Sequence, residues 1–240
     1  MAGSAGVGGN GGSGGLAPAI GCDPLAPSYC GFPYPNDYFT VEDPGTVTGR
    51  RLALPAEVMP IDTSGRRSDP SAFNEMDGFS PGIAAMTHLP GATVMGLATP
   101  DTIGDSLATD SPTLILNADT GERVPHWVDR DEWVVEAKKR IDAEESRPDF
   151  DIPRTLAELQ EEQALMLRPA VRLDDATRYI VATRGVLDGS GTPVMPSAGF
   201  AALRDGEPGD EVIESRREHY ESIFSTLEAA GVERDDLQSA

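Results

Sequence analysis

Proline and glycine are spaced so closely through residues 22–112 that this part of the chain shows little helical periodicity. The segment FPYPNDYF, residues 32–39, carries two prolines in four residues, and proline lacks the N–H that a helix interior needs. The residue before each proline is also biased toward extended backbone. We therefore expect a mainly β fold of short strands joined by long loops rich in proline and glycine.

Several apolar runs have the length and the boundaries of β-strands. TGRRLALP, residues 48–55, alternates as a short strand does, and TLILNADTGERVPHWV, residues 113–128, predicts two strands around an Asp-Thr-Gly turn. The continuous run 114–116 is typical of a strand in a sandwich core. We expect the strands within 113–128 and 164–186 to pair in one core, with these residues among those buried: Leu116, Leu167, Tyr179 and Val181.

Helical periodicity is strongest in two later segments. Residues 131–163 look like an insertion, with one helix opened by Asp131 and a second that starts at Pro153. In residues 210–240, apolar side chains recur at i, i+3, i+4 and i+7, which predicts an amphipathic helix ending at Gly231. Its apolar face needs a partner surface, either the sandwich or another domain: Tyr220, Ile223, Phe224 and Leu227.

Charge excludes several classes of partner. The chain carries 40 acidic residues against 19 lysines and arginines, a formal net charge of -21. Recognition of phosphate groups relies on a basic surface, so binding to nucleic acid or to an anionic membrane is not expected. No apolar run approaches the roughly 18 residues of a membrane-spanning helix.

Residues 1–21 have no charged side chain and no apolar core of a signal peptide. A tract of glycine and serine has few side chains to bury, so we interpret it as a disordered, flexible tether. Such tethers often join a membrane anchor to a secreted domain, which places an export signal and a lipid anchor upstream. The chain then divides into this tether, a β-sandwich domain at 22–209 with the insertion, and a helical linker at 210–240.

The two cysteines lie close together in GCDPLAPSYCGFP. Seven residues separate Cys22 from Cys30, a spacing that does not fit a zinc knuckle, and no second pair completes four ligands. A small disulfide-closed loop is the favoured interpretation, and it indicates an oxidising compartment. Two unrelated thiols in a cytosolic protein are the alternative.

The stretch GFSPG, residues 78–82, matches the G-x-S-x-G pattern of a hydrolase nucleophile elbow. The elbow needs a buried strand before its first glycine, and the preceding residues DPSAFNEMD are polar and turn-forming. The residue after the nucleophile supplies an oxyanion-hole N–H, and Pro81 has none. Losing one such donor slows catalysis by about 10²–10³. Ser80 is therefore predicted to lie in a turn, and no catalytic residue is assigned.

Other candidate sites also have simpler explanations. The loops around Asp119 and Asp188 could offer oxygen ligands to calcium, but neither matches an EF-hand, and hairpin turns explain both. Trp127 and Trp133 could form a ligand platform, whereas burial in a β-rich core is the more common role. We predict no cofactor and no metal site.

Three stretches together resemble a known family: FPYPNDYF through FNEMDGFSPG, then LRPAVRLDDATRYIVATRGVLDGSGTPV, then RREHYESIFSTLEAAGVERDDLQSA. They are similar to the N-terminal domain of bacterial virulence-factor lipases and to secreted lipoproteins of myxobacterial type. The second stretch also looks like a bacterial Ig-like segment. The resemblance implies an Ig-like β-sandwich that precedes an α/β-hydrolase-like domain of the same polypeptide. The insertion at 131–163 departs from the shorter connections of that family.

These features favour a non-catalytic, extracytoplasmic N-terminal module of a surface-exposed lipase- or esterase-like lipoprotein, with this chain a fragment of the whole. Under this hypothesis the full-length protein is a serine esterase or lipase. A free-standing cell-surface Ig-like module for interaction or adhesion is the alternative. A weaker alternative is that the chain is itself a serine hydrolase.

The cysteine spacing generates the first prediction. In protein purified in air, Cys22 and Cys30 should form a disulfide that stabilises the fold by about 2–3 kcal/mol. Intact mass after alkylation, with and without reductant, measures this directly. Two thiols that alkylate in the native, unreduced protein would rule the disulfide out.

Overall fold

The computed structural model describes residues 23, 25–26, 31–62, 64–130, 132–143 and 155–240. The fold is mixed α/β, with several small antiparallel sheets and four α-helices. Helix accounts for 30% and strand for 21%, so helices contribute more than a mainly β fold would have. The reason is that two helices pack directly on the central sheet and complete its core.

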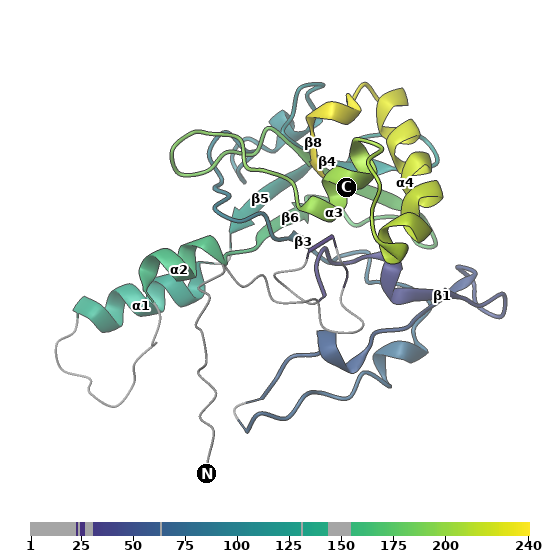
Figure 1. The fold of residues 1–240 in the computed structure, drawn as a ribbon, viewed down its shortest axis with the longest axis horizontal. Helices are drawn as coiled ribbons and strands as arrows, with labels where there is room; N and C mark the ends of the chain where they lie inside the picture. Colours follow the sequence, from purple (N-terminus) through teal and green to yellow (C-terminus); the bar gives the residue numbers. More distant parts are fainter. Residues whose placement is uncertain (1–22, 24, 27–30, 63, 131, 144–154) are drawn as a thin grey trace, which may run out of the picture.

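Two three-stranded antiparallel sheets form the centre of the molecule (Figure 1). One has the strand order β3-β6-β5, and the other has the order β4-β7-β8. In the second sheet, β4 and β7 pair over five positions, from Thr113 opposite Thr183 to Asn117 opposite Tyr179. The six strands are β3 (Ala85–Thr87), β4 (Thr113–Asn117), β5 (His126–Arg130), β6 (Leu165–Pro169), β7 (Tyr179–Arg184) and β8 (Leu237–Ser239).

The two strands expected within 113–128 are present as β4 and β5, but they belong to different sheets. After the turn, the chain first returns along β4, with the Val124 N–H donating to the Ile115 carbonyl at 2.8 Å. Pro125 follows and has no N–H to continue that ladder. The chain therefore leaves β4 and pairs with β6 in the other sheet.

Both faces of the β4–β7 pair are buried. Leu114 and Leu116 face a core shared with helices, whereas Ile115 faces a second core shared with the β3-β6-β5 sheet. All five residues of β4 are buried. The β4-β7-β8 sheet is thus the middle of three layers, with helices on one face and the other sheet on the opposite face.

The helical layer consists of α3 (Ala198–Arg204) and α4 (Glu211–Ala229). The Asp210 carboxylate caps α4 by accepting from the Ile213 N–H at 2.9 Å, and the helix is followed by Gly231 with φ of +79°. The apolar face predicted from the sequence is buried, and its partner surface is the sheet: Tyr220, Ile223, Phe224 and Leu227. The segment interpreted as a linker therefore shares its core with the strands.

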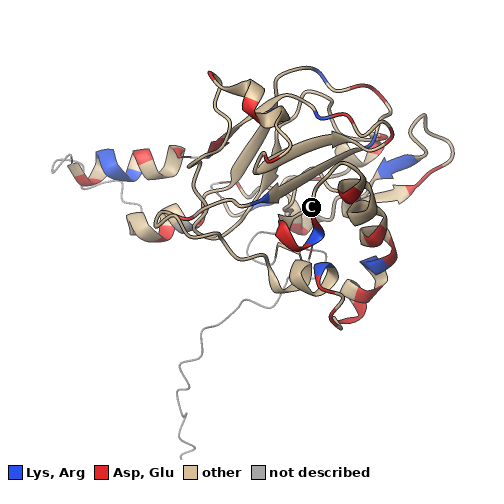
Figure 2. Ribbon diagram, turned by 90° about the horizontal axis from the view of Figure 1, so that it is seen from above, with Lys and Arg blue, Asp and Glu red and all other residues tan. Residues whose placement is uncertain are grey.

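The insertion forms a pair of helices, α1 (Trp133–Ala143) and α2 (Leu156–Glu161), which project from the body (Figures 1 and 2). Val135 of α1 and Leu159 of α2 are buried. The second helix begins after Thr155, and Pro153, where it is expected to start, lies outside the described residues. A capping box explains this start, because Thr155 and Glu158 satisfy each other's backbone N–H groups.

Residues 31–83 form a smaller lobe around the β-hairpin of β1 (Thr40–Glu42) and β2 (Arg50–Leu52). The peptide bonds before Pro33 and Pro35 are both cis. This lobe contains the short 3-10 helices η1 (Asp37–Phe39), η2 (Ala56–Val58) and η3 (Phe73–Glu75). The 3-10 helices η4 (Ile103–Leu107) and η5 (Arg234–Asp236) belong to the body of the molecule. A third cluster of buried side chains holds the lobe: Phe39, Leu52, Leu54 and Met59.

The predicted core is correct in part. Leu116 and Leu167 are fully buried. Tyr179 and Val181 are only partly buried and pack against the core between the two sheets. In β7 it is the alternate residues Ile180 and Ala182 that face the helices.

Replacing Leu116 with Ala should lower the free energy of unfolding by about 2–5 kcal/mol, because the cavity would open between β4 and α4. Urea denaturation measures the change. Val47→Ala is the control, since Val47 is 87% exposed and should change stability by about 0.5 kcal/mol at most. Equal effects of the two substitutions would contradict the assignment of β4 to the core.

Candidate functional site

Ser80 lies on an exposed turn of the small lobe. Its hydroxyl accepts from the Gly82 N–H at 3.4 Å, and its carbonyl accepts from Ile83. Phe79 packs against the cluster of the small lobe and meets Tyr34 edge to face at 5.3 Å between ring centroids. The described chain continues from this turn into β3, with no helix after the serine. The local geometry is that of a turn, as the sequence predicts, and not that of a strand–elbow–helix.

The three histidines have separate surroundings. His126 is fully buried, with Nε2 at 2.9 Å from the Thr113 hydroxyl and Nδ1 at 2.9 Å from the Val124 carbonyl. Burial lowers the pKa of His126, which favours the neutral ring. His88 is buried beside a cavity, and His219 lies on α4. The hydrogen bonds of His126 run to Thr113 and Val124, and His219 pairs with Asp37.

A buried ion pair ties the first described residue to α4. The Arg216 guanidinium lies 2.5 Å from the Asp23 carboxylate, with the side chains 9% and 0% exposed. The same carboxylate accepts from the Leu25 N–H at 2.9 Å and from the Asn36 side-chain amide. Both oxygens of the buried carboxylate therefore accept hydrogen bonds, which is the condition for such a pair to be tolerated.

Two tyrosines enclose the Arg216 guanidinium. Its central carbon lies 4.9 Å from the Tyr38 ring centroid and 5.1 Å from that of Tyr220. Aromatic faces attract a cation, and this attraction grows as water is excluded. Tyr220 also donates its hydroxyl to the Ala240 carbonyl at 2.9 Å. One buried arginine thus joins the small lobe, α4 and the end of β8.

A second charged contact lies beside the first. His219 Nε2 is 2.8 Å from the Asp37 carboxylate, and both side chains are 38% exposed. Burial alone would raise the pKa of Asp37, but the hydrogen bond from His219 and the positive charges of Arg178 and Arg216 lower it below its ordinary value. A carboxylate–imidazole pair can act in acid–base chemistry when a reacting group is within reach. Here its contacts hold η1 against α4.

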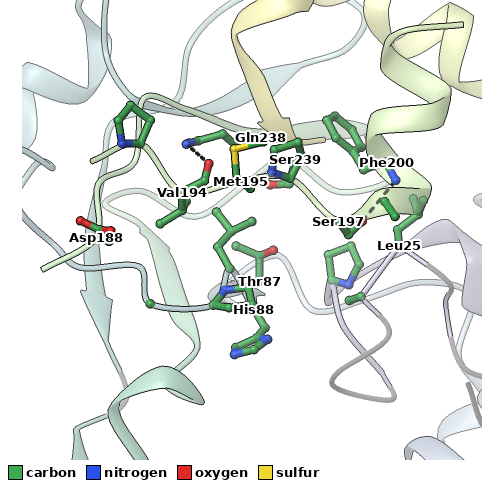
Figure 3. A pocket seen from close by; sticks show the side chains of 18 of the residues that line it. Leu25, Thr87, His88, Asp188, Val194, Met195, Ser197, Phe200, Gln238 and Ser239 are labelled. Atoms are coloured by element: carbon green, nitrogen blue, oxygen red, sulfur yellow. Dashed lines mark hydrogen bonds between the residues drawn. The ribbon is translucent and has the colours of Figure 1, made fainter. Parts of the chain in front are cut away.

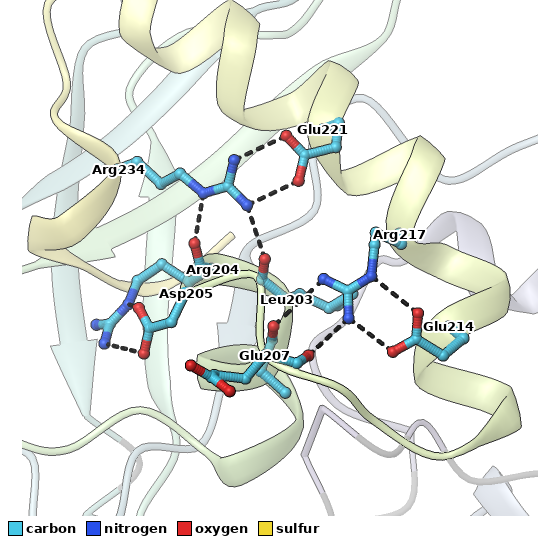
Figure 4. Close-up of polar contacts among 9 residues, drawn as sticks. Leu203, Arg204, Asp205, Glu207, Glu214, Arg217, Glu221 and Arg234 are labelled. Carbon is cyan, nitrogen blue, oxygen red and sulfur yellow. Dashed lines mark hydrogen bonds and ion pairs between the residues drawn. The ribbon is translucent and has the colours of Figure 1, made fainter.

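Three arginines occupy the carboxyl end of α3 (Figure 4). Arg234 donates to the carbonyls of Leu203 and Arg204 and forms two 2.7 Å contacts with Glu221. Arg217 donates to the Glu207 carbonyl while pairing with Glu214. The last carbonyls of a helix lack intrahelical donors and carry partial negative charge, so guanidinium groups stabilise them. The third member, Arg204, reaches the Leu237 carbonyl of β8 at 2.9 Å.

A cavity of about 580 Å³ opens among the end of β3, residues 188–200 and the end of β8 (Figure 3). Polar groups at its edge include Thr87, Gln238 and Ser239. Gln238 is held in place because its side-chain amide bonds both backbone groups of Val186 and the carbonyl of Val194. The walls are largely apolar, as in sites that take small molecules or short chain segments: Leu25, Leu89, Val194, Met195 and Phe200.

The two candidate calcium loops are hairpin turns. The Asp188 carboxylate accepts from the Ser190 N–H, the Ser190 hydroxyl and the Thr192 N–H at 2.7–2.9 Å. At Asp119 the turn is closed instead by the Asn117 side chain, which accepts from the N–H of Asp119. Within the described ranges, His, Asp and Glu side chains form no group of three or more that could hold a metal ion.

The tryptophan expectation holds only in part. Trp127 on β5 is half-buried, whereas Trp133 at the start of α1 is 74% exposed. The prediction of a core position for Trp133 is wrong because the helical pair projects from the body instead of packing on a sheet. Cys22, Cys30, the tether at 1–21 and Asp131 lie outside the described residues.

No family model, curated protein or solved structure matches the chain. Of the helices in the described ranges, none has the length and hydropathy needed to cross a membrane. Sequence reasoning did not find the Asp23–Arg216 pair or the cavity. Their members are separated by up to 193 positions, and single charges in an acidic chain carry no local signal.

Replacing Arg216 with Met or Asp23 with Asn should each destabilise the fold by about 3–5 kcal/mol, because the partner group is left buried without its counterpart. The double variant should lose clearly less than the sum of the two. A double-mutant cycle by urea denaturation measures this coupling. Strictly additive losses would show that the pair does not form.

Asp37 should contribute to stability against acid. Its pKa is lowered by folding, so its contribution is present above the unfolded value of about 3.9 and is lost as pH falls through the folded-state pKa. Asp37→Asn should therefore lower the melting temperature near pH 7. On acidification, the melting temperature of this variant should fall by less than that of the parent protein. The control is Asp119→Asn on an exposed turn, whose melting temperature should depend on pH as that of the parent protein does. Parallel profiles for parent and Asp37→Asn would contradict the assignment.

Proposed function

We propose that this chain is a non-catalytic, extracytoplasmic N-terminal module of a surface-exposed lipoprotein, and that it orients an α/β-hydrolase-like domain of the same polypeptide. Its two face-to-face antiparallel sheets would form the Ig-like sandwich of that module, with α3 and α4 as an added layer. The placement outside the cytoplasm and the lipid anchor upstream are supported by the cysteine spacing and by the resemblance to virulence-factor lipases.

One observation carries the proposal: the stretches that bear the resemblance supply the framework of this fold. The second stretch contains the end of β6, all of β7 and the Asp188 turn, and the third contains most of α4 together with β8. Their side chains are used in packing, turns and the Arg216 contacts. Residues of a scaffold have this character, whereas residues of a catalytic site converge on a reacting group.

The turn at residues 78–82 supports the same interpretation. Pro81 cannot supply an oxyanion-hole N–H, and Ser80 accepts hydrogen bonds from Gly82 and Ile83 within its own turn. A serine hydrolase activity of the wider protein would then belong to the neighbouring domain, with its own nucleophile between a strand and a helix.

The 240-residue chain should not hydrolyse short-chain p-nitrophenyl esters above background, and Ser80→Ala should leave that result unchanged. The gene product that includes the neighbouring domain should hydrolyse them, also independently of Ser80. Initial rates for the four proteins provide the test. Turnover by the 240-residue chain that Ser80→Ala abolishes would overturn the proposal, and a reading frame that stops at residue 240 would favour a free-standing surface interaction module.

A further inference from the structure

The cavity of Figure 3 lies between the outer strands of the two central sheets. β3 and β8 are the end strands of their sheets, and the ends of both strands line the cavity. Leu25 and Phe200 in its walls belong to the core beneath α4. Leu89 and Val194 belong to the core between the sheets. Its volume of about 580 Å³ falls within the roughly 300–1,000 Å³ of sites that take small molecules.

The Thr87 hydroxyl differs from other polar groups of this cavity. Thr87 is 7% exposed, and its hydroxyl points into the cavity (Figure 3). Within the part of the chain that the structure describes, this hydroxyl forms no hydrogen bond. By contrast, the Ser239 hydroxyl lies 2.8 Å from that of Thr183, and the Ser197 hydroxyl accepts from the Phe200 N–H. Buried polar groups are normally hydrogen-bonded, so Thr87 indicates a ligand that carries a hydrogen-bonding group.

The charges around the cavity restrict the ligand further. Of the described residues that line it, none is a lysine or an arginine, and Asp188 adds a carboxylate. The whole chain has a net charge of -21. An anionic ligand would therefore meet no basic side chain here and would be repelled by the acidic surface. The largely apolar walls offer few hydrogen bonds to water, whereas they stabilise an apolar ligand by removing it from water.

We propose that this cavity binds a neutral, largely apolar molecule with one hydroxyl or carbonyl group, such as a fatty alcohol. The apolar part of the ligand packs between Leu89, Val194 and Phe200. Its polar group forms a hydrogen bond with the Thr87 hydroxyl, which can donate or accept. The inference goes beyond the proposed function, because this binding needs neither a neighbouring domain nor a lipid anchor.

Fluorescence of N-phenyl-1-naphthylamine, a neutral apolar probe, measures binding to the 240-residue chain. The fluorescence should rise when the chain is added, and 1-decanol should displace the probe. Decanoate near pH 8 has the same length and an anionic head, and it should need concentrations at least about tenfold higher. A chain that does not bind the probe would overturn the proposal, and equal displacement by decanoate would contradict the neutral ligand.

Thr87→Val tests the polar contact, because valine keeps the shape of threonine and removes its hydroxyl. The melting temperature of the chain without ligand should not fall, since this hydroxyl has no hydrogen bond to lose. The affinity for 1-decanol should fall about three- to tenfold, the worth of one hydrogen bond. The control Thr109→Val, at an exposed threonine outside the cavity, should change neither quantity. Unchanged affinity in Thr87→Val would refute the contact.

Ala198→Trp tests the place of binding. Ala198 is an exposed residue of the cavity lining, so a larger side chain there should fill the cavity and leave the melting temperature unchanged. Binding of the probe and of 1-decanol should each weaken at least about tenfold. The control is Ala229→Trp at the exposed end of α4, which should bind both as the parent chain does. Probe binding that persists in folded Ala198→Trp would place the ligand elsewhere and overturn the proposal.

Discussion

The fold depends on a strand pair, β4 and β7, whose two faces are both buried. Leu114 and Leu116 pack against α4 on one face, and Ile115 packs against the opposite sheet on the other. A strand of this kind cannot expose either face to water without losing roughly 1.5–3 kcal/mol for each large side chain. Both the helical layer and the second sheet are therefore required, and the three layers form together or not at all.

Charged groups complete this apolar framework at its edges. Arg216 crosses from α4 to Asp23 and to the Tyr38 ring of the small lobe. Arg234 donates to the last carbonyls of α3, Arg217 to the Glu207 carbonyl that follows this helix, and Arg204 to the Leu237 carbonyl of β8. In a chain with 19 basic residues against 40 acidic ones, these arginines donate to backbone carbonyls and carboxylates at the junctions between elements. The acidic excess then remains on the surface, where it favours solubility.

Local patterns predicted the elements well, because they depend on neighbours in sequence. The spacing of Tyr220 to Leu227 gave α4, and the apolar run at 114–116 gave β4. Which elements would pack against one another was harder to predict from the sequence. Pro125 diverts β5 to the other sheet, and the pairing of Asp23 with Arg216 spans 193 positions. The absence of an elbow at Ser80 could be predicted, since a proline's missing N–H is a local property.

The central claim is that α4 belongs to the same cooperative unit as the β4–β7 pair, so that the chain is one scaffold. Native-state hydrogen exchange read by mass spectrometry tests it most directly. The buried amides of β4, β7 and the middle of α4 should exchange with one common free energy, that of global unfolding, and should shift together with added urea. Exchange of the α4 amides through a separate opening of lower free energy, while β4 and β7 stay protected, would contradict the account.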